Sequence, residues 1–172
     1  MTIPYLRLAT NNDVPAIMTI IEDARQFLHD QKIPQWLNGH PGVTTIQGDV
    51  AQKIGYVLIV DGQIAGYTAL WQGSDPNYQQ IDGAWATDSQ HYTALHRVAI
   101  SSAFRGRHLA SFLITNLVTL SYERGYRDVR IDTHELNQPM QHVIASAGFK
   151  YRGIITILRD GSPRRAYQML LN

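Results

Sequence analysis

The segment at residues 105–110, RGRHLA, combines two arginines and a glycine in a pattern that can bind an anion. The apolar segment YTALHRVAI precedes it and has the composition of a β-strand. Apolar residues at helical spacing follow it, namely Leu109, Phe112, Leu113, Leu117 and Leu120. A helix that begins here would present unpaired N–H groups and the positive end of its dipole, which favour phosphate. Because arginines in turns also occur on ordinary surfaces, this segment alone indicates an anion site only weakly.

Several alternative chemistries lack their residues in this chain. The patterns G-x-x-x-x-G-K-[ST] and G-x-G-x-x-G are absent, which disfavours P-loop NTPases and Rossmann dehydrogenases. The chain has no cysteine, which excludes disulfides, thiolate zinc sites and a cysteine nucleophile. The HELN segment at His134 lacks the second histidine of H-E-x-x-H, and no G-x-S-x-G motif occurs. We therefore expect no metal site and no serine-hydrolase mechanism.

Two threonines mark expected helix starts in the first part of the chain. Thr10 follows the strand-like residues 3–9 and has Asp13 three positions later, which is a capping-box pattern. Thr44 with Gln47 repeats this pattern. Two helices are therefore expected after the first strand.

Two Asp-Gly pairs predict β-hairpins, because both central positions of a tight hairpin turn favour positive φ. Asp61-Gly62 joins two β-rich runs, and Asp160-Gly161 joins the last two. Residues 73–90 are rich in polar and turn residues and are expected to be irregular.

The remaining elements alternate between strand and helix. A strand is expected at residues 128–134, and a helix with Pro139 in its first turn is expected to stop at Gly148. The predicted order is β-α-α-β-β-β-α-β-α-β-β, which is a mixed α/β fold.

Length and composition indicate one ordinary globular domain spanning residues 1–172. Fifteen basic and 14 acidic residues give a net charge of +1, so no global field favours nucleic acid, and any anion site must be local. No segment approaches a membrane span, and the first ten residues lack the features of a signal peptide. We expect a cytoplasmic protein with no nucleic-acid or membrane partner; a homodimer is left open.

The segment at residues 105–110 resembles motif A of the GNAT N-acetyltransferases, which is Gln or Arg, two residues, Gly, one residue, then Gly or Ala. Arg105 and Ala110 match, whereas His108 replaces the central glycine. A second segment, NQPMQHVIASAGF, is similar to motif B of the same family, with Asn137, Gly148 and Phe149 at the matching positions. Two motifs at the correct separation make the resemblance specific, and it covers essentially the whole chain. Within the family, the chain resembles a bacterial subgroup.

The resemblance implies a mixed, mostly antiparallel sheet of about seven strands, split between the fourth and fifth strands and flanked by about four helices. It also implies direct transfer of an acetyl group from acetyl-CoA to a primary amine of a small molecule or peptide through a tetrahedral intermediate. The cofactor would be bound by the fourth strand, the following loop and Asn137, which together comprise Val98, Ala99, Ile100, Arg105, Gly106, Arg107, His108, Leu109, Ala110, Ser111 and Asn137. The Val98 N–H would stabilise the oxyanion.

Three side chains are candidates for the base that must deprotonate the attacking ammonium. Asp132 lies five residues before Asn137, where the ribosomal-alanine-acetylating branch of the family carries a glutamate, and it is the first choice. His96 would share a strand face with Val98 and has a suitable unperturbed pKa of about 6.5. His134 would share a face with Asp132 and could relay a proton or orient the carboxylate. Polar residues on strands are also commonly structural.

The family's general acid is missing, because Ile144 occupies the position of the motif B tyrosine. Ile144 is expected to pack in the core. Either Tyr92 or water would protonate the leaving thiolate, or catalysis would be reduced. Trp36, Trp85 and Tyr92 are candidate walls of an acceptor site. Glu22 and Asp23 could attract a cationic amine, although such charges usually form only a solvated helix face.

Two other functions stay open on this sequence. The substitutions at His108 and Ile144 are compatible with a non-catalytic acyl-CoA-binding or regulatory domain. The third alternative is an interaction protein that retains only the fold.

Overall fold

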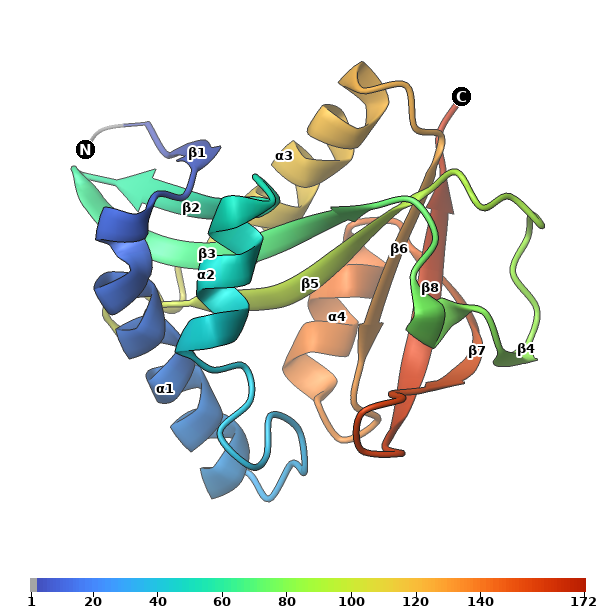
Figure 1. The fold of residues 1–172 in the computed structure, drawn as a ribbon, viewed down its shortest axis with the longest axis horizontal. Coiled ribbons are helices and arrows are strands. Elements are labelled where there is room, and N and C mark those ends of the chain that lie inside the picture. Colours follow the sequence, from blue (N-terminus) through green and yellow to red (C-terminus); the bar gives the residue numbers. More distant parts are fainter. Residues whose placement is uncertain (1–2) are drawn as a thin grey trace. The chain divides into compact units, whose positions relative to one another are not determined.

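The computed structural model describes residues 3–172 (Figure 1). Its helices are α1 (Val14–Asp30), α2 (Val43–Ala51), α3 (Leu109–Glu123) and α4 (Gln138–Ser146). Three short 3-10 helices are η1 (Asn11–Asp13), η2 (Pro76–Tyr78) and η3 (Ser102–Phe104). The strands are β1 (Tyr5–Leu8), β2 (Gly55–Val60), β3 (Gln63–Gln72), β4 (Ile81–Gly83), β5 (Thr93–Ile100), β6 (Asp128–Thr133), β7 (Lys150–Thr156) and β8 (Pro163–Leu170).

The strands form one sheet in the order β1-β2-β3-β5-β6-β8-β7-β4. β5 and β6 pair in parallel, whereas β1 with β2, β2 with β3, β6 with β8, β7 with β8 and β4 with β7 pair antiparallel. The expected mixed, mostly antiparallel sheet with four α-helices is confirmed. The described residues form eight strands rather than seven, because the segment expected to be irregular contains β4 as well as η2.

The pairing of β5 with β6 is short. It runs from Thr93 opposite Val129 to Leu95 opposite Ile131, while β5 continues to Ile100. These are the fourth and fifth strands expected from the sequence, so the ladder is interrupted where the split was predicted.

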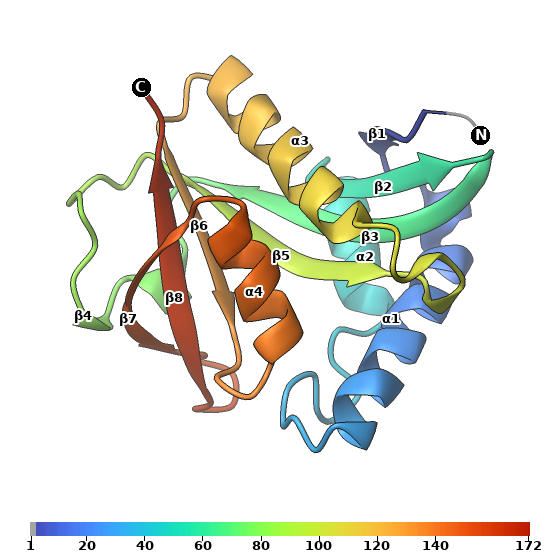
Figure 2. The same ribbon diagram turned by 180° about the vertical axis from the view of Figure 1, so that it is seen from behind.

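The chain divides into two compact units, and the first comprises the described residues up to Leu70 together with Arg97–Leu113. Alternation along β2 sends Val57 and Ile59 into the cluster beneath α1 and α2, and Leu58 and Val60 into the cluster with the start of α3. Both faces of β2 are therefore buried, which explains its uninterrupted apolar sequence (Figures 1 and 2).

The second unit comprises Trp71–His96 and Ile114–Asn172. One face of its strands carries a cluster that includes Tyr78 of η2, Ala94 of β5 and Ala166 of β8. Gly83 and Gly153 face each other where β4 meets β7, and a Cβ on either would collide with a backbone oxygen of the other strand. Only glycine permits this close approach.

The predicted start of the first helix is confirmed, and that of the second is shifted. Asp13 accepts hydrogen bonds from the N–H and the hydroxyl of Thr10, at 2.7 and 2.9 Å. The second helix begins at Val43 with Gly42 as its cap, so Thr44 lies inside the first turn instead of capping it.

Both predicted hairpins are present. Asp61 and Gly62 have φ of 50° and 77° and alone connect β2 to β3. The second connection is longer, because the strands end at Thr156 and restart at Pro163. No helix within residues 3–172 is long and apolar enough to cross a membrane.

Candidate active site

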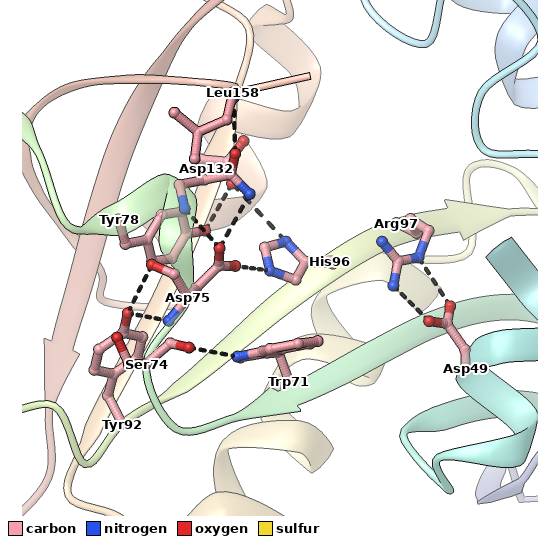
Figure 3. A network of polar contacts seen from close by, with 11 residues as sticks. Asp49, Trp71, Ser74, Asp75, Tyr78, Tyr92, His96, Arg97, Asp132 and Leu158 are labelled. Carbon is pink, nitrogen blue, oxygen red and sulfur yellow. Dashed lines mark hydrogen bonds and ion pairs between the residues drawn. The ribbon is translucent and has the colours of Figure 1, made fainter. Parts of the chain in front are cut away.

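His96 lies between two carboxylates of the second unit (Figure 3). Its Nε2 is 2.6 Å from Oδ2 of Asp75, and its Nδ1 is 4.0 Å from Oδ2 of Asp132. The side chains of His96, Asp75 and Asp132 are 17%, 5% and 11% exposed. An imidazole held by a carboxylate is an arrangement suited to general acid–base chemistry.

The start of η2 positions Asp75. Its Oδ1 accepts the N–H of Asn77 at 2.9 Å, and its own N–H donates to the hydroxyl of Tyr92 at 2.7 Å. Pro76 follows as the first residue of η2, where an N–H is not needed. Burial acts to raise the pKa of Asp75, but the hydrogen bond and charge of His96 together with the hydrogen bonds from Asn77 outweigh it, and the pKa is lowered. Asp75 is therefore held ionised beside the imidazole.

Tyr78 closes the other side of the cluster. Its hydroxyl donates to Oδ2 of Asp132 at 2.6 Å, and its ring packs near those of Trp85 and Tyr92, with centroids 5.4 and 6.2 Å away. Burial and the charge of Asp132 raise the pKa of Tyr78 well above its usual value. The phenol therefore stays protonated and fixes the orientation of the Asp132 carboxylate.

The third predicted base, His134, is not joined to this cluster. The side chain is 5% exposed, and its Nδ1 accepts the N–H of Leu136 at 3.1 Å just after β6 ends. Burial and the charge of Arg164 lower the pKa of His134. The structure therefore brings Asp132 and His96 together and gives His134 a structural contact.

The backbone of β5 changes conformation directly after His96. Arg97 has φ of 56°, in the left-handed region that is uncommon for residues other than glycine. Strict alternation of side chains is interrupted there, so the premise that His96 and Val98 share a face does not hold. Within the first unit, Val98 and Ile100 pack in the cluster that includes the start of α3, and Ala99 packs in the cluster beneath α1 and α2.

A partly buried ion pair in the first unit holds the Arg97 side chain. Its Nε and Nη2 donate to the two carboxylate oxygens of Asp49 at 2.9 and 2.7 Å (Figure 3). Tyr67 donates its hydroxyl to the same carboxylate at 2.6 Å. This fixed two-pronged contact offsets the cost of the positive φ and defines where β5 deforms.

The loop expected to bind phosphate connects β5 to α3. Gly106 and His108 have φ of 77° and 55°, and the carbonyl of His108 accepts the N–H of Phe112 at 3.2 Å. His108 thus ends the loop and caps α3, which begins at Leu109. Left-handed residues near a helix start turn successive N–H groups toward a common point, which is a known anion-binding geometry.

The two arginines of this loop are exposed and make only loose contacts. Arg105 lies over the ring of Phe27 at 4.7 Å. Arg107 lies over that of Phe104 at 5.4 Å, with Nη2 3.9 Å from Asp61. Further along, Leu109 is buried, and Ala110 and Ser111 are half-buried in α3.

Asn137 caps α4. Its Oδ1 accepts the N–H of Met140 at 3.2 Å, and its own N–H donates to the carbonyl of His134. The expected helix with Pro139 in its first turn is confirmed, and Gly148 follows its end with φ of 99°. The amide oxygen of Asn137 is therefore committed to the helix cap.

The remaining predictions concern the general acid and the acceptor. Ile144 is fully buried, as expected for a core residue. Trp85 lies with its ring 4.2 Å from the guanidinium carbon of Arg130 and donates to the carbonyl of Tyr78, while Trp36 packs partly buried against the cluster beneath α1 and α2. Asp23 accepts the hydroxyl of Ser102 at 2.8 Å.

Four residues of these networks carry no functional signal in the sequence patterns: Asp49, Asp75, Tyr78 and Arg97. The Asp-Pro pair at 75–76 does signal a helix cap, but it does not reveal that the second carboxylate oxygen meets His96. No signal in the sequence marks the pairing of Asp49 with Arg97. Among residues 3–172 no group of three His, Cys, Asp or Glu side chains could hold a metal ion.

The comparisons with known proteins establish the family of this fold. The model of the Acetyltransferase (GNAT) family matches residues 21–149, which is more than half of the chain. The chain belongs to the GNAT acetyltransferase family, as the two sequence motifs indicated. A comparison with curated proteins found no match.

Solved structures agree. A GNAT-family acetyltransferase from Streptococcus agalactiae 2603 is 35% identical, with a TM-score of 0.90 over 98% of this chain and 96% of that one. A ribosomal-protein-alanine N-acetyltransferase from Brucella melitensis is 18% identical, with a TM-score of 0.70 over 97% and 99% of the chains. A GNAT-family acetyltransferase from Listeria monocytogenes 4b F2365 is 22% identical, with a TM-score of 0.75 over 98% and 95%. The latter two show the shared fold alone.

Proposed function

We propose that this protein is an acetyl-CoA-dependent N-acetyltransferase that acts on a primary amine, with residues 1–172 as one catalytic domain. The observation that carries the proposal is the contact of His96 with Asp75, with the Asp132 carboxylate on the other side of the imidazole. His96 takes the proton that an acceptor ammonium must lose. Asp132 attracts the ammonium and is the second candidate for the base.

The amine nitrogen then attacks the thioester carbonyl carbon of acetyl-CoA. The new C–N bond gives a tetrahedral oxyanion, toward which the Val98 N–H donates. Collapse breaks the C–S bond and restores the carbonyl, and water carries the second proton of the nitrogen to the CoA thiolate. Because Ile144 carries no proton, water supplies this proton; Tyr92 is directed toward Asp75 instead.

Acetyl-CoA supplies the activated acetyl group, and the loop between β5 and α3 fits its pyrophosphate. The left-handed Gly106 and His108 and the exposed Arg105 and Arg107 provide N–H groups and charge for this purpose. Val98, Ala99 and Ile100 offer strand backbone to the pantetheine amides. No metal is required by this scheme, and a cytoplasmic location stays a prediction.

The test is release of free CoA thiol from acetyl-CoA with a panel of primary amines, with the product mass confirming N-acetylation. We expect amine-dependent release that is lost in His96→Asn. If Asp132→Asn abolishes release and His96→Asn does not, the carboxylate is the base. Stabilisation by acetyl-CoA in a thermal melt without amine-dependent release would instead favour the non-catalytic acyl-CoA-binding function, for which Ile144 is the motivating observation. Absence of any thermal shift would favour a pure interaction protein.

A further inference from the structure

Arg164 is a buried cation that has no close ion-pair partner among the described residues. It lies on β8, is 5% exposed, and donates from Nη1 to the carbonyl of the preceding Pro163 at 2.9 Å. It forms no ion pair with any residue of the described part of the chain. Arg130, which is 2% exposed, shows the usual alternative, because its Nη2 pairs with Asp128 at 2.8 Å and its guanidinium lies 3.8 Å from the ring of Tyr92. A buried guanidinium without such partners loses its hydration uncompensated.

The register of the sheet places Arg164 beside the proposed catalytic cluster. Asp132 on β6 is directly opposite Ala166 on β8. Alternation puts Arg164 on the face of Ala166, so Arg164 is the diagonal neighbour of Asp132, roughly 7–8 Å away along the sheet. Burial lowers the pKa of Arg164, while the charges of Asp132 and, to a smaller extent, Asp160 act to raise it, which agrees with the proximity of Asp132.

Only one nitrogen of the Arg164 side chain has a protein acceptor among the described residues, which is Nη1. The fully buried side-chain N and O atoms without a partner in residues 3–172 are Arg25 Nε, Thr133 Oγ1 and Arg152 Nε. The Nε and Nη2 of Arg164 are not among these sealed atoms, and no described residue accepts a hydrogen bond from them. A planar pair of N–H donors matches the two oxygens of a carboxylate.

We propose that Arg164 binds a carboxylate of the acceptor, and that the acceptor is an amino acid or a similar molecule with a carboxylate close to its primary amine. The ammonium then lies at Asp132 and His96, and the carboxylate lies at Arg164. This specificity rests on the proposed acetyl transfer.

The test compares each of a set of free amino acids with its carboxamide, using CoA release with wild type and Arg164→Gln. We expect wild type to favour the carboxylate by roughly 10- to 100-fold in kcat/KM. Arg164→Gln should remove this preference, because kcat/KM falls much further for the free amino acids than for the carboxamides. Arg165→Gln, which changes the adjacent arginine, should keep the preference. If Arg164→Gln does not fold, Arg164→Lys replaces it in the test. Lysine keeps the positive charge but lacks the planar guanidinium, so the preference for the carboxylate over the carboxamide should be reduced.

Equal activity of wild type on acids and amides would overturn the carboxylate site while leaving the acetyl transfer intact. An equal loss on both acceptor types in Arg164→Gln would also overturn it, since that result indicates a structural role. If no amine of either kind is acetylated, the acetyl transfer fails, and calorimetric titration of the free amino acids decides the carboxylate site. Binding to wild type but not to Arg164→Gln would then support the site, and equal or absent binding would reject it.

Discussion

Nε2 of His96 and Oδ2 of Asp75 are 2.6 Å apart, although 21 residues separate the two in sequence. The contact joins the middle of β5 to the cap of a three-residue helix in a segment that looks irregular from its composition. It makes Asp75 the residue that positions the proposed base.

Asp75→Asn separates the two roles of Asp75, which are to cap η2 and to hold the imidazole of His96. Asparagine still caps η2, so the fold should persist, but the neutral amide no longer stabilises a protonated imidazole. We expect kcat with the best amine to fall about 10- to 100-fold, with KM for acetyl-CoA unchanged. The exposed Asp88→Asn is the matched control and should have wild-type kcat. An increase in KM alone would contradict a positioning role in catalysis.

Arg97 tests how the bend in β5 is stabilised. Arg97→Ala and Arg97→Gly both remove the contact with Asp49, and each should lower the free energy of unfolding by about 3 kcal/mol or more, since a buried carboxylate is left unpaired. Because φ is 56°, alanine carries an added cost that glycine avoids, so Gly should be the more stable variant by about 1 kcal/mol. Denaturant unfolding measures both. Equal stability would show that the bend relaxes once the ion pair is gone.

His108→Gly tests the residue that departs from motif A. Its φ of 55° favours glycine, so the free energy of unfolding should rise by roughly 0.5–1 kcal/mol. Acetyl-CoA binding, measured by calorimetry, should be preserved or tightened. His108→Ala removes the imidazole but keeps the Cβ and serves as the control. A large loss of affinity in both variants would instead make the imidazole itself a phosphate ligand.

Asp13 gives a pH dependence of stability. It accepts hydrogen bonds from both terminal nitrogens of Arg7, at 2.7 and 2.9 Å, which with the bonds from Thr10 lower its pKa despite burial. Because folding lowers this pKa, the stabilisation is complete above the unfolded value of about 3.9 and is lost as the pH falls below it. At pH 7, Asp13→Asn should lower the free energy of unfolding by about 1 kcal/mol.

The difference in the free energy of unfolding between wild type and Asp13→Asn should stay constant from pH 7 to about pH 5 and shrink below about pH 4. Thermal or urea unfolding at several pH values measures it. Asp30→Asn, an exposed change in α1, is the control and should show no such trend. A difference that grows toward acid pH would mean that folding raises the pKa of Asp13 instead of lowering it.

The elements were predictable because their signals are local. The two Asp-Gly turns, the capping pattern of Thr10 with Asp13, and Pro139 and Gly148 around α4 each act within a few residues. The strand β4 escaped prediction because three residues show no periodicity, and it forms only through pairing with β7. Thr44 does not cap α2, because the helix begins one residue earlier and Gly42 occupies the cap position.

Residue types at short or fixed spacing were sufficient to predict the order of elements, the two family motifs and the candidacy of His96, Asp132 and Asn137. Three relations became visible only in the folded chain: His96 bonds to Asp75, Asp49 holds Arg97 in a left-handed conformation, and Arg164 lies diagonal to Asp132. Those relations depend on sheet register and on loops returning to strands far away in the chain. Periodicity describes which face a residue takes, but not which distant residue meets it there.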